Sequence, residues 1–342
     1  MAILGLSLVG FAGLLGRPAI PWDALARETG VPARDLPRAW AHDGLTPLGE
    51  AVLREAVVRA DGFEIRDRDF DLKFIAAHHR IGDLIEFVVA AGDGREMTVR
   101  APLASFYARR GYPIVFLVTG AFGFLIGFGV FVLRPDDRRA RLFFWLSVAF
   151  SSAVMISGEW YGVQGRPLHL VPGVLFFFAY TLTPVILLKF VRAFAPRERL
   201  RAEPFLWAAA LLFAAFFSAV VVIALLAPSV AIFRLKAYFI VFRLFFGAVC
   251  VAAVVILFRA FRAAPSRERR DQVRWVLYGL ITGLGPFMVL YSLPVALGLR
   301  PPLNEEAASV FFVALPPALA FAILRYRLMD IDVIINRSVV YS

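Results

Sequence analysis

A short connection between two apolar stretches concentrates residue types that could recognise a ligand. Its charged, aromatic and imidazole side chains are Glu159, Trp160, Tyr161, Arg166 and His169. Arg243 lies about six residues into a separate apolar run, roughly 9 Å from its start at 1.5 Å per residue. One interpretation is that Arg243 faces inward and pairs with Glu159, since opposite charges at one depth on two helices can form a ligand pocket or a switch. The alternative is that Arg243 extends to the lipid headgroups and that the aromatic residues form an interfacial belt.

A second set of residues could transmit a conformational change. Pro316 and Pro317 interrupt the last apolar run, and they are expected to bend its helix because proline removes a backbone donor. The amphipathic segment 325–342 follows and could serve as a mechanical linker, or it could lie on the bilayer surface. The charged residues of this segment that we assign to signal transmission are Arg325, Arg327, Asp330 and Asp332.

Signatures of catalysis are missing from the sequence. It contains no GxxxxGK phosphate loop, no HExxH pair and no GxSxG nucleophile elbow. His78 and His79 are adjacent and have no third ligand nearby in sequence, so a solvated helix end is favoured over a metal site. The single cysteine, Cys250, cannot form an intrachain disulfide. We therefore expect no catalytic residue, no metal and no cofactor in this chain.

The elements that must position these residues are membrane helices. Of the 342 residues, 60% are hydrophobic and 18% charged, against roughly 25% charged in a typical soluble domain. The mean hydropathy of +0.73 excludes a disordered chain and an ordinary soluble enzyme. About 20 apolar residues in a helix cross roughly 30 Å of hydrocarbon. Seven such runs lie at 113–133, 142–159, 170–191, 205–227, 237–258, 275–298 and 307–324. Residues 1–16 are apolar but short, and they could form a shortened first transmembrane helix.

The net charge of +11 indicates the orientation of the chain. Basic residues concentrate in every second loop: segments 134–141, 192–201, 259–274 and 325–337 together hold 17 Lys and Arg residues, against four in the intervening loops. This asymmetry predicts that the basic loops lie in the cytoplasm, where they can meet anionic membrane lipids. Nucleic-acid binding has no support. The polar block 17–112 is then extracytoplasmic.

The polar block has the pattern of a small α/β domain. VVRADGFEIRD (57–67) predicts a strand, an Asp61-Gly62 turn and a second strand. A helix is expected at 69–79, and two alternating strands at 81–103 meet around Gly92-Asp93-Gly94. Short helical stretches are expected at 25–38 and 47–58.

This block resembles the second half of a PDZ domain. The resemblance rests on ADGFEI followed by RIGDLIEFVVAAGDGREMTVRAPL, with a strand ending in Asp-Gly, a helix, Gly-Asp and a closing hairpin. The carboxylate-binding Gly-Leu-Gly-Phe loop of PDZ domains has its nearest counterpart at Asp43-Gly44-Leu45. Capture of peptide C-termini, recognition of another ligand and a structural role all remain open.

The C-terminal segment AFAILRYRLMDIDVIINRSVVY (320–341) resembles the end of the multi-helix input region of bacterial membrane sensor histidine kinases, such as the competence-pheromone receptor kinase. RPDDRRARLFF (134–144), RRDQVRWVLYGLITGLGPF (269–287) and FFVALPPALAFAILRYR (311–327) agree with that pattern. The resemblance implies a homodimeric input region of a two-component system in the bacterial inner membrane. An unknown extracellular ligand or peptide would act on it. A catalytic domain beyond this fragment would use ATP and Mg and pass phosphate to a response regulator.

We thus predict a polytopic α-helical membrane protein with a PDZ-like α/β extracytoplasmic domain. Its parts are 1–16, a first transmembrane helix if it spans; 17–112, the PDZ-like domain; 113–324, a seven-helix sensor bundle; and 325–342, the cytoplasmic linker to a missing output domain. The alternatives are the same input module coupled to a serine phosphatase or a cyclase, a membrane transporter, and a stand-alone PDZ-like scaffold.

Overall fold

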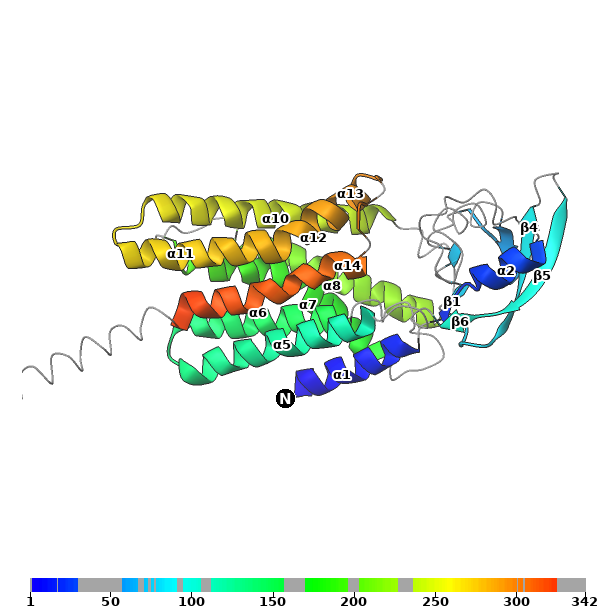
Figure 1. Cartoon of the computed structure of the whole chain (residues 1–342), viewed down its shortest axis with the longest axis horizontal. Coiled ribbons are helices and arrows are strands. Elements are labelled where there is room, and N and C mark those ends of the chain that lie inside the picture. Colours follow the sequence, from blue (N-terminus) through cyan, green and yellow to red (C-terminus); the bar gives the residue numbers. More distant parts are fainter. Residues whose placement is uncertain are drawn as a thin grey trace, which may run out of the picture.

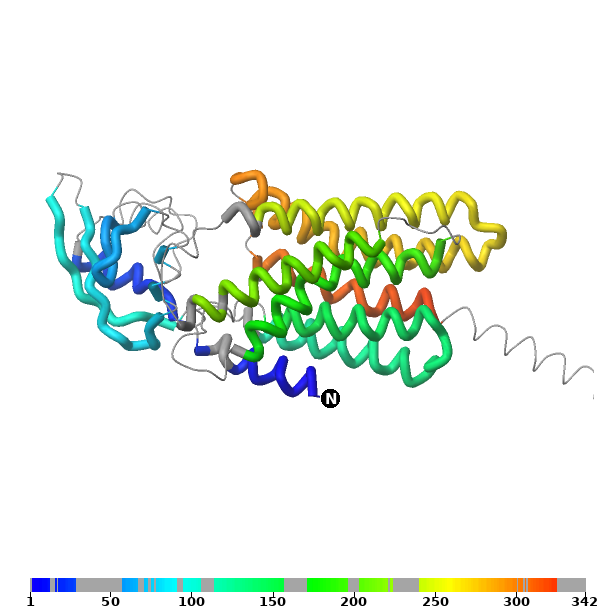
Figure 2. The backbone as a smooth tube through the Cα atoms, turned by 180° about the vertical axis from the view of Figure 1, so that it is seen from behind, coloured from blue at the N-terminus to red at the C-terminus, as the bar shows by residue number. Residues whose placement is uncertain are grey.

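The computed structural model describes residues 2–16, 18–29, 57–66, 71–72, 75–76, 78–90, 95–105, 112–156, 170–195, 203–226, 236–299, 301–303 and 305–324. Most of these residues are helical and form an elongated bundle, with a small β-sheet domain at one end (Figures 1 and 2). We call this end of the bundle the sheet end, and the opposite end the basic end, because the turns 134–137 and 263–266 with their flanking arginines lie there (Figure 1).

The bundle is built from long apolar helices and one interrupted helix. The long ones are α5 (Tyr112–Leu133), α6 (Arg138–Met155), α7 (Leu170–Arg192), α8 (Glu203–Leu226) and α10 (Lys236–Arg262). The interrupted helix runs through α11 (Arg267–Gly279), η5 (Leu280–Leu284), α12 (Gly285–Phe287), η6 (Met288–Ser292) and α13 (Leu293–Ala296). The last helical stretch comprises α14 (Glu305–Ser309), the 3₁₀ segment η7 (Val310–Ala314) and residues 315–324.

Six helical segments of the described chain are long and apolar enough to cross a membrane. They are Ile114–Leu133, Val171–Arg192, Glu203–Val220, Ile240–Arg262, Arg267–Ala296 and Ala307–Leu324. The chain therefore has the makeup of a multi-pass membrane protein. The remaining predicted run, 142–159, lies largely within α6, which begins with three arginines in its first turn and is not among the six. α6 nevertheless packs between α5 and α7.

The N-terminal apolar run forms α1 (Ala2–Leu15), which is shorter than the six. It packs on α6 and α7 near the sheet end (Figure 1). The Ser7 hydroxyl donates to the carbonyl of Ile3 at 2.8 Å and lies 3.1 Å from the hydroxyl of Ser152 on α6. These contacts satisfy a buried polar group that lipid could not satisfy.

Small residues bring pairs of helices close together, and the sequence has two pairs of glycines one turn apart, Gly123/Gly127 and Gly279/Gly283. On α5, Gly127 leaves no room for a Cβ against Ser147 of α6. On the interrupted helix, a Cβ at Gly283 would lie 2.8 Å from the Cβ of Leu315. Both contacts are internal to the chain, so the glycines serve packing within the bundle.

Two π-helical segments interrupt the helix 267–296. Each precedes a proline, and in each the next N–H reaches back five residues: Gly285 to the carbonyl of Leu280, and Leu293 to that of Met288. Pro286 and Pro294 each lack the N–H that a regular helix would use, and the wider turns accommodate this loss.

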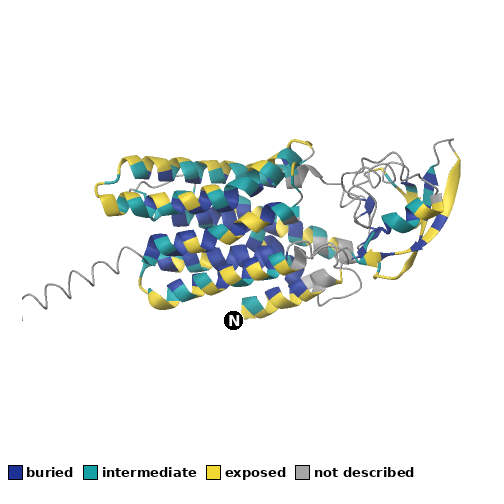
Figure 3. Cartoon of the chain, in the orientation of Figure 1, coloured by how far each residue is buried: buried dark blue, intermediate teal, exposed yellow. Residues whose placement is uncertain are grey.

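The sheet domain contains a four-stranded antiparallel sheet in the order β3-β2-β4-β5. Its strands are β2 (Val57–Ala60), β3 (Phe63–Glu64), β4 (Leu84–Ala90) and β5 (Glu96–Pro102). A second, two-stranded sheet pairs β1 (Pro18–Ala19) with β6 (Ala104–Ser105), and α2 (Trp22–Thr29) packs against β5. Alternate residues of β4 and β5 are buried and exposed, so one face of the sheet forms the domain core (Figure 3).

The paired strands of both predicted hairpins are confirmed, although Gly92-Asp93-Gly94 of the second hairpin lies outside the described residues. One predicted helix is wrong where it can be checked. Asp61 and Gly62 form the β2–β3 turn with φ of 51° and 77°, the left-handed values such turns require. Two predictions cover Val57 and Val58, and these residues belong to the strand predicted from residue 57 (β2), not to the end of the helix predicted at 47–58. Their β-branched side chains suit a pleated strand paired with β4. The rest of that predicted helix lies outside the described residues.

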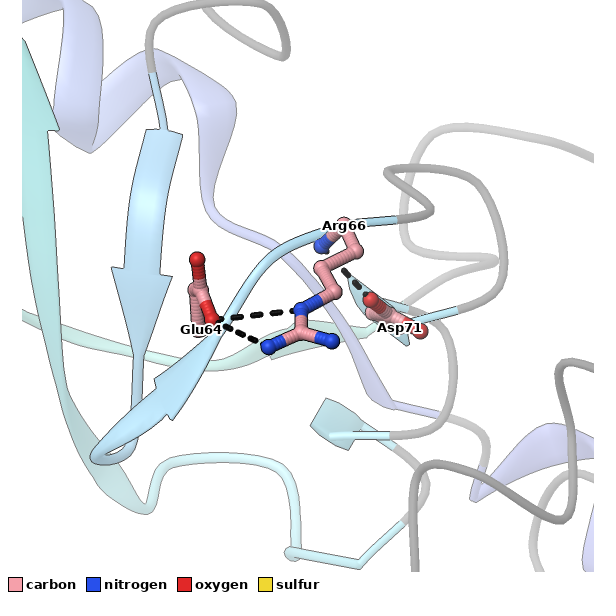
Figure 4. Close-up of polar contacts among 3 residues, drawn as sticks. All are labelled: Glu64, Arg66 and Asp71. Atoms are coloured by element: carbon pink, nitrogen blue, oxygen red, sulfur yellow. Dashed lines mark hydrogen bonds and ion pairs between the residues drawn. The ribbon is translucent and has the colours of Figure 1, made fainter.

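A buried carboxylate fixes the chain beyond β3 (Figure 4). Asp71 is fully buried and accepts a hydrogen bond from the backbone N–H of Arg66 at 2.9 Å. The Arg66 guanidinium in turn donates to Glu64 at 2.9 and 3.2 Å. Asp71 thereby compensates a backbone donor inside the domain, which is a structural role.

Replacing Gly127 by Leu should destabilise the bundle by about 1–3 kcal/mol, the usual cost of overpacking a close contact. Gly129→Leu is the matched control, because nothing lies within 4 Å of a Cβ at Gly129 on the same helix. Thermal unfolding in detergent measures both variants. Equal midpoints for the two would contradict the close α5–α6 approach.

Candidate functional site

Polar side chains from four elements converge in the half of the bundle nearest the sheet end. We call this set, Tyr180 of α7, Arg243 of α10, Tyr291 of η6 and Glu305 of α14, the sheet-end cluster. The Tyr291 hydroxyl donates to Oε2 of Glu305 at 2.9 Å. The Arg243 guanidinium lies 5.4 Å from the centre of the Tyr291 ring. Arg243 also hydrogen-bonds the Tyr180 side chain.

The position of Arg243 makes these contacts necessary. Arg243 is seven residues into α10, or about 10 Å along the helix. A cation within the hydrocarbon costs about 2.5–3.5 kcal/mol at mid-membrane, so an inward-facing partner is favoured. The Tyr291 ring and the Tyr180 side chain supply such partners for Arg243 within the bundle.

An aromatic wall adjoins the sheet-end cluster. The Tyr180 ring lies 4.8 Å from that of Phe242, which is fully buried, and Phe242 lies 5.3 Å from Phe213 of α8. These rings join α7, α8 and α10 at the depth of Arg243. Because they exclude water from one side of the cluster, they strengthen its electrostatic contacts.

A second group of contacts, the basic-end cluster, lies at the other end of the bundle and is centred on Arg139 of α6. Its Nη1 donates to Oε1 of Gln272 on α11 at 3.2 Å, and its Nε donates to the carbonyl of Ala193 after α7 at 3.3 Å. Its guanidinium carbon also lies 4.8 Å from the centre of the Phe194 ring. Asp137 caps α6 by accepting the Arg139 N–H at 2.8 Å. One side chain thereby ties together three helices.

A single helix joins the two clusters. Gln272 and Tyr291 both lie on the interrupted helix, 19 residues apart, which is about 28 Å at 1.5 Å per residue and close to the thickness of the hydrocarbon. Between Gln272 and Tyr291 lie η5, Pro286 and the first part of η6, and Tyr291 is itself part of η6. π-helical turns occur frequently at functional sites, because they present side chains out of the regular helical phase.

Only some of the site residues predicted from the sequence lie in or near the two clusters. Arg243 belongs to the sheet-end cluster and faces into the bundle. Pro316 packs near Gly123 of α5, 3.3 Å from where a Cβ would stand, and Pro317 follows it in the last helix. The other predicted residues lie outside the described part of the chain: Glu159, Trp160, Tyr161, Arg166, His169, Arg325, Arg327, Asp330 and Asp332.

Sequence reasoning missed five of the clustered residues. They are Arg139, Tyr180, Gln272, Tyr291 and Glu305. Glu305 carried a signal, since it is an acid immediately before the apolar run 307–324. Arg139 was one of several basic residues in its loop, and nothing in the sequence distinguished it from its neighbours.

The described residues contain no group of three or more metal-ligating side chains arranged to hold a metal ion. His79 instead places Nε2 2.9 Å from Oδ2 of Asp61 in the sheet domain. Comparison with protein-family models, with curated proteins and with solved structures found no match.

Tyr291→Phe should lower the stability of the bundle by about 1.5–3 kcal/mol, because it removes a hydrogen bond to a charged group. Tyr278→Phe is the control, since Tyr278 lies on the same helix with 53% of its surface exposed. Midpoints of thermal unfolding in detergent compare the two. A Tyr291→Phe protein as stable as Tyr278→Phe would argue against the contact with Glu305.

Arg139→Lys keeps the charge but should loosen the basic-end cluster, because an ammonium cannot donate in two directions with a planar fork and stack on Phe194. We expect faster hydrogen exchange of the amides around Ala193 and Gln272. Arg138→Lys, at an exposed neighbouring position, should leave that exchange unchanged. The same rates in both variants would show that Arg139 does not hold the three helices.

Proposed function

We propose that this chain is the signal-sensing membrane input region of a bacterial two-component sensor histidine kinase. It would transmit an extracellular or intramembrane signal to a cytoplasmic catalytic domain. The observation that carries the proposal is the interrupted helix, which joins a polar cluster at each end of the bundle. A module that only anchors a domain has no need of such a connection.

The proposed orientation follows from the charges. The turns 134–137 and 263–266 lie at the end of the bundle opposite the sheet domain (Figures 1 and 2). Under the positive-inside rule, the basic end then faces the cytoplasm and the sheet domain lies outside the inner membrane. In this proposal α6 is a seventh membrane crossing, and the sheet domain is a PDZ-like unit, supported by its two hairpins and their order.

The proposed mechanism is a shift between two packings of the interrupted helix. A ligand near the sheet end would change the contacts among Arg243, Tyr291 and Glu305. A π-helical turn can revert to α-helix, which rotates the residues beyond it, so the change would reach Gln272 and its contact with Arg139. The ligand must bind one packing more tightly than the other for the population to move.

The last helix would deliver the change to the output. Gly279 and Gly283 of the interrupted helix pack directly on Ala318 and Leu315, so a rotation of one helix must displace the other. Phosphotransfer from ATP with Mg to a histidine, in a homodimer that serves a response regulator, is what the family resemblance supplies to this proposal. The residues of this chain contribute sensing and transmission only.

A fusion of the chain to the catalytic part of a well-characterised sensor kinase tests the proposal. Autophosphorylation in membrane vesicles should change severalfold with Tyr291→Phe and with the double variant Pro316→Ala/Pro317→Ala. Tyr278→Phe should leave it as in the parent fusion. If all three variants give the parent rate while the fusion stays folded and active, the bundle does not control the output.

A further inference from the structure

The turn between α10 and α11 carries a strongly basic surface. We call segment 259–274 the basic hairpin; its arginines are Arg259, Arg262, Arg267, Arg269, Arg270 and Arg274. Against these six stand two acids, Glu268 and Asp271, so the segment carries a net charge of +4. None of the six arginines forms an ion pair within the described chain, and all but Arg269 are exposed. This much unpaired charge favours an anionic partner.

Two of these arginines are held in place by aromatic rings. The guanidinium of Arg262 lies over the Phe258 ring at 4.5 Å, and that of Arg270 lies over the Phe261 ring at 5.6 Å. Arg270 on α11 thus stacks on the residue of α10 next to Arg262, which brings both arginines to the packed helix pair at the α10–α11 turn. Stacking uses the faces of the guanidinium groups and leaves their edges able to donate paired hydrogen bonds to a phosphate.

Exposed apolar side chains continue from the basic hairpin along both helices. Phe258 and Val255 on α10 are 47% and 42% exposed, and Tyr278 and Ile281 on the neighbouring helix are 53% and 57% exposed. A soluble anion would contact the arginines alone. A molecule with a charged headgroup and a hydrocarbon tail contacts both surfaces at once.

We propose that the basic hairpin binds an anionic phospholipid, with the phosphate of the headgroup at Arg262 and Arg270. The acyl chains lie along the exposed apolar residues of α10 and the interrupted helix. Neither Arg262 nor Arg270 belongs to the two polar clusters, and the lipid site does not depend on the proposed function.

The turn between α5 and α6 offers an internal comparison. Segment 134–141 has four arginines and two aspartates, so its net charge is +2. Arg139 in that segment already donates hydrogen bonds to Gln272 and to the carbonyl of Ala193. Arg138 and Arg141 are exposed at the same end of the bundle, and neither is stacked on a ring within the described residues. Removing two arginines from the basic hairpin, and in a second variant two from segment 134–141, can therefore distinguish a specific lipid site from general attraction of anions to the basic end.

The test is a titration of the purified chain in neutral detergent with short-chain phosphatidylglycerol, and with phosphatidylcholine of the same chain length. We expect saturable binding of phosphatidylglycerol only. The double variant Arg262→Gln/Arg270→Gln should weaken it roughly tenfold or more. Arg138→Gln/Arg141→Gln, which removes the same charge, should change it far less. Size-exclusion profiles check that both variants remain folded.

Three results would overturn the proposal. Equal loss of affinity in the two double variants would indicate diffuse charge attraction. Unchanged affinity in Arg262→Gln/Arg270→Gln would place any lipid elsewhere. Full displacement of the lipid by an equimolar amount of inorganic phosphate would identify a site for soluble anions, in which the exposed apolar residues have no part.

Discussion

Hydrocarbon offers no hydrogen bonds, so a charged side chain or a backbone group that enters the bundle is stabilised by partners inside the protein. The backbone shows this at Pro286 and Pro294, where a regular helix would lose a bond and wider turns provide a substitute. Arg243 shows it for a charge, because Tyr291 of η6 and Tyr180 of α7 contact it from two other elements of the bundle. The interrupted helix, the sheet-end cluster and the arrangement of α7, α10 and α14 all follow from this constraint.

Packing between the helices depends on small residues and rings, since lipid tails are as apolar as leucine and burial alone drives little association. Gly127 against Ser147, and Gly283 against Leu315, allow close backbone approach. Aromatic rings fill the wider space between α7, α8 and α10. The close contact of Gly283 with Leu315 holds the interrupted helix against the last helix of the bundle.

The sheet domain has the pattern of a domain in contact with water. Its strands alternate between a buried apolar face and an exposed face on which Arg59 meets Glu96 and Arg100 meets Glu86. Such exposed pairs contribute little stability, so the domain depends on its apolar face and on buried groups such as Asp71. The bundle helices are therefore apolar on most of their surface, whereas the strands of the sheet domain alternate between apolar and polar residues. The hydropathy pattern changes between these two parts of the chain.

The sequence alone determined the long apolar helices, their approximate limits, the strands of the two hairpins and the position of Arg243 along its helix, because each depends on residues close together in the chain. Hydropathy runs, alternation and an Asp-Gly turn are local patterns. The partners of Arg243 and Arg139 were decided only by tertiary structure. Tyr291 and Glu305 are distant from Arg243 in sequence, and no local pattern reports which way a side chain points around a uniformly apolar helix. That direction is set when neighbouring helices pack and leave a polar group one place where its hydrogen bonds can be made.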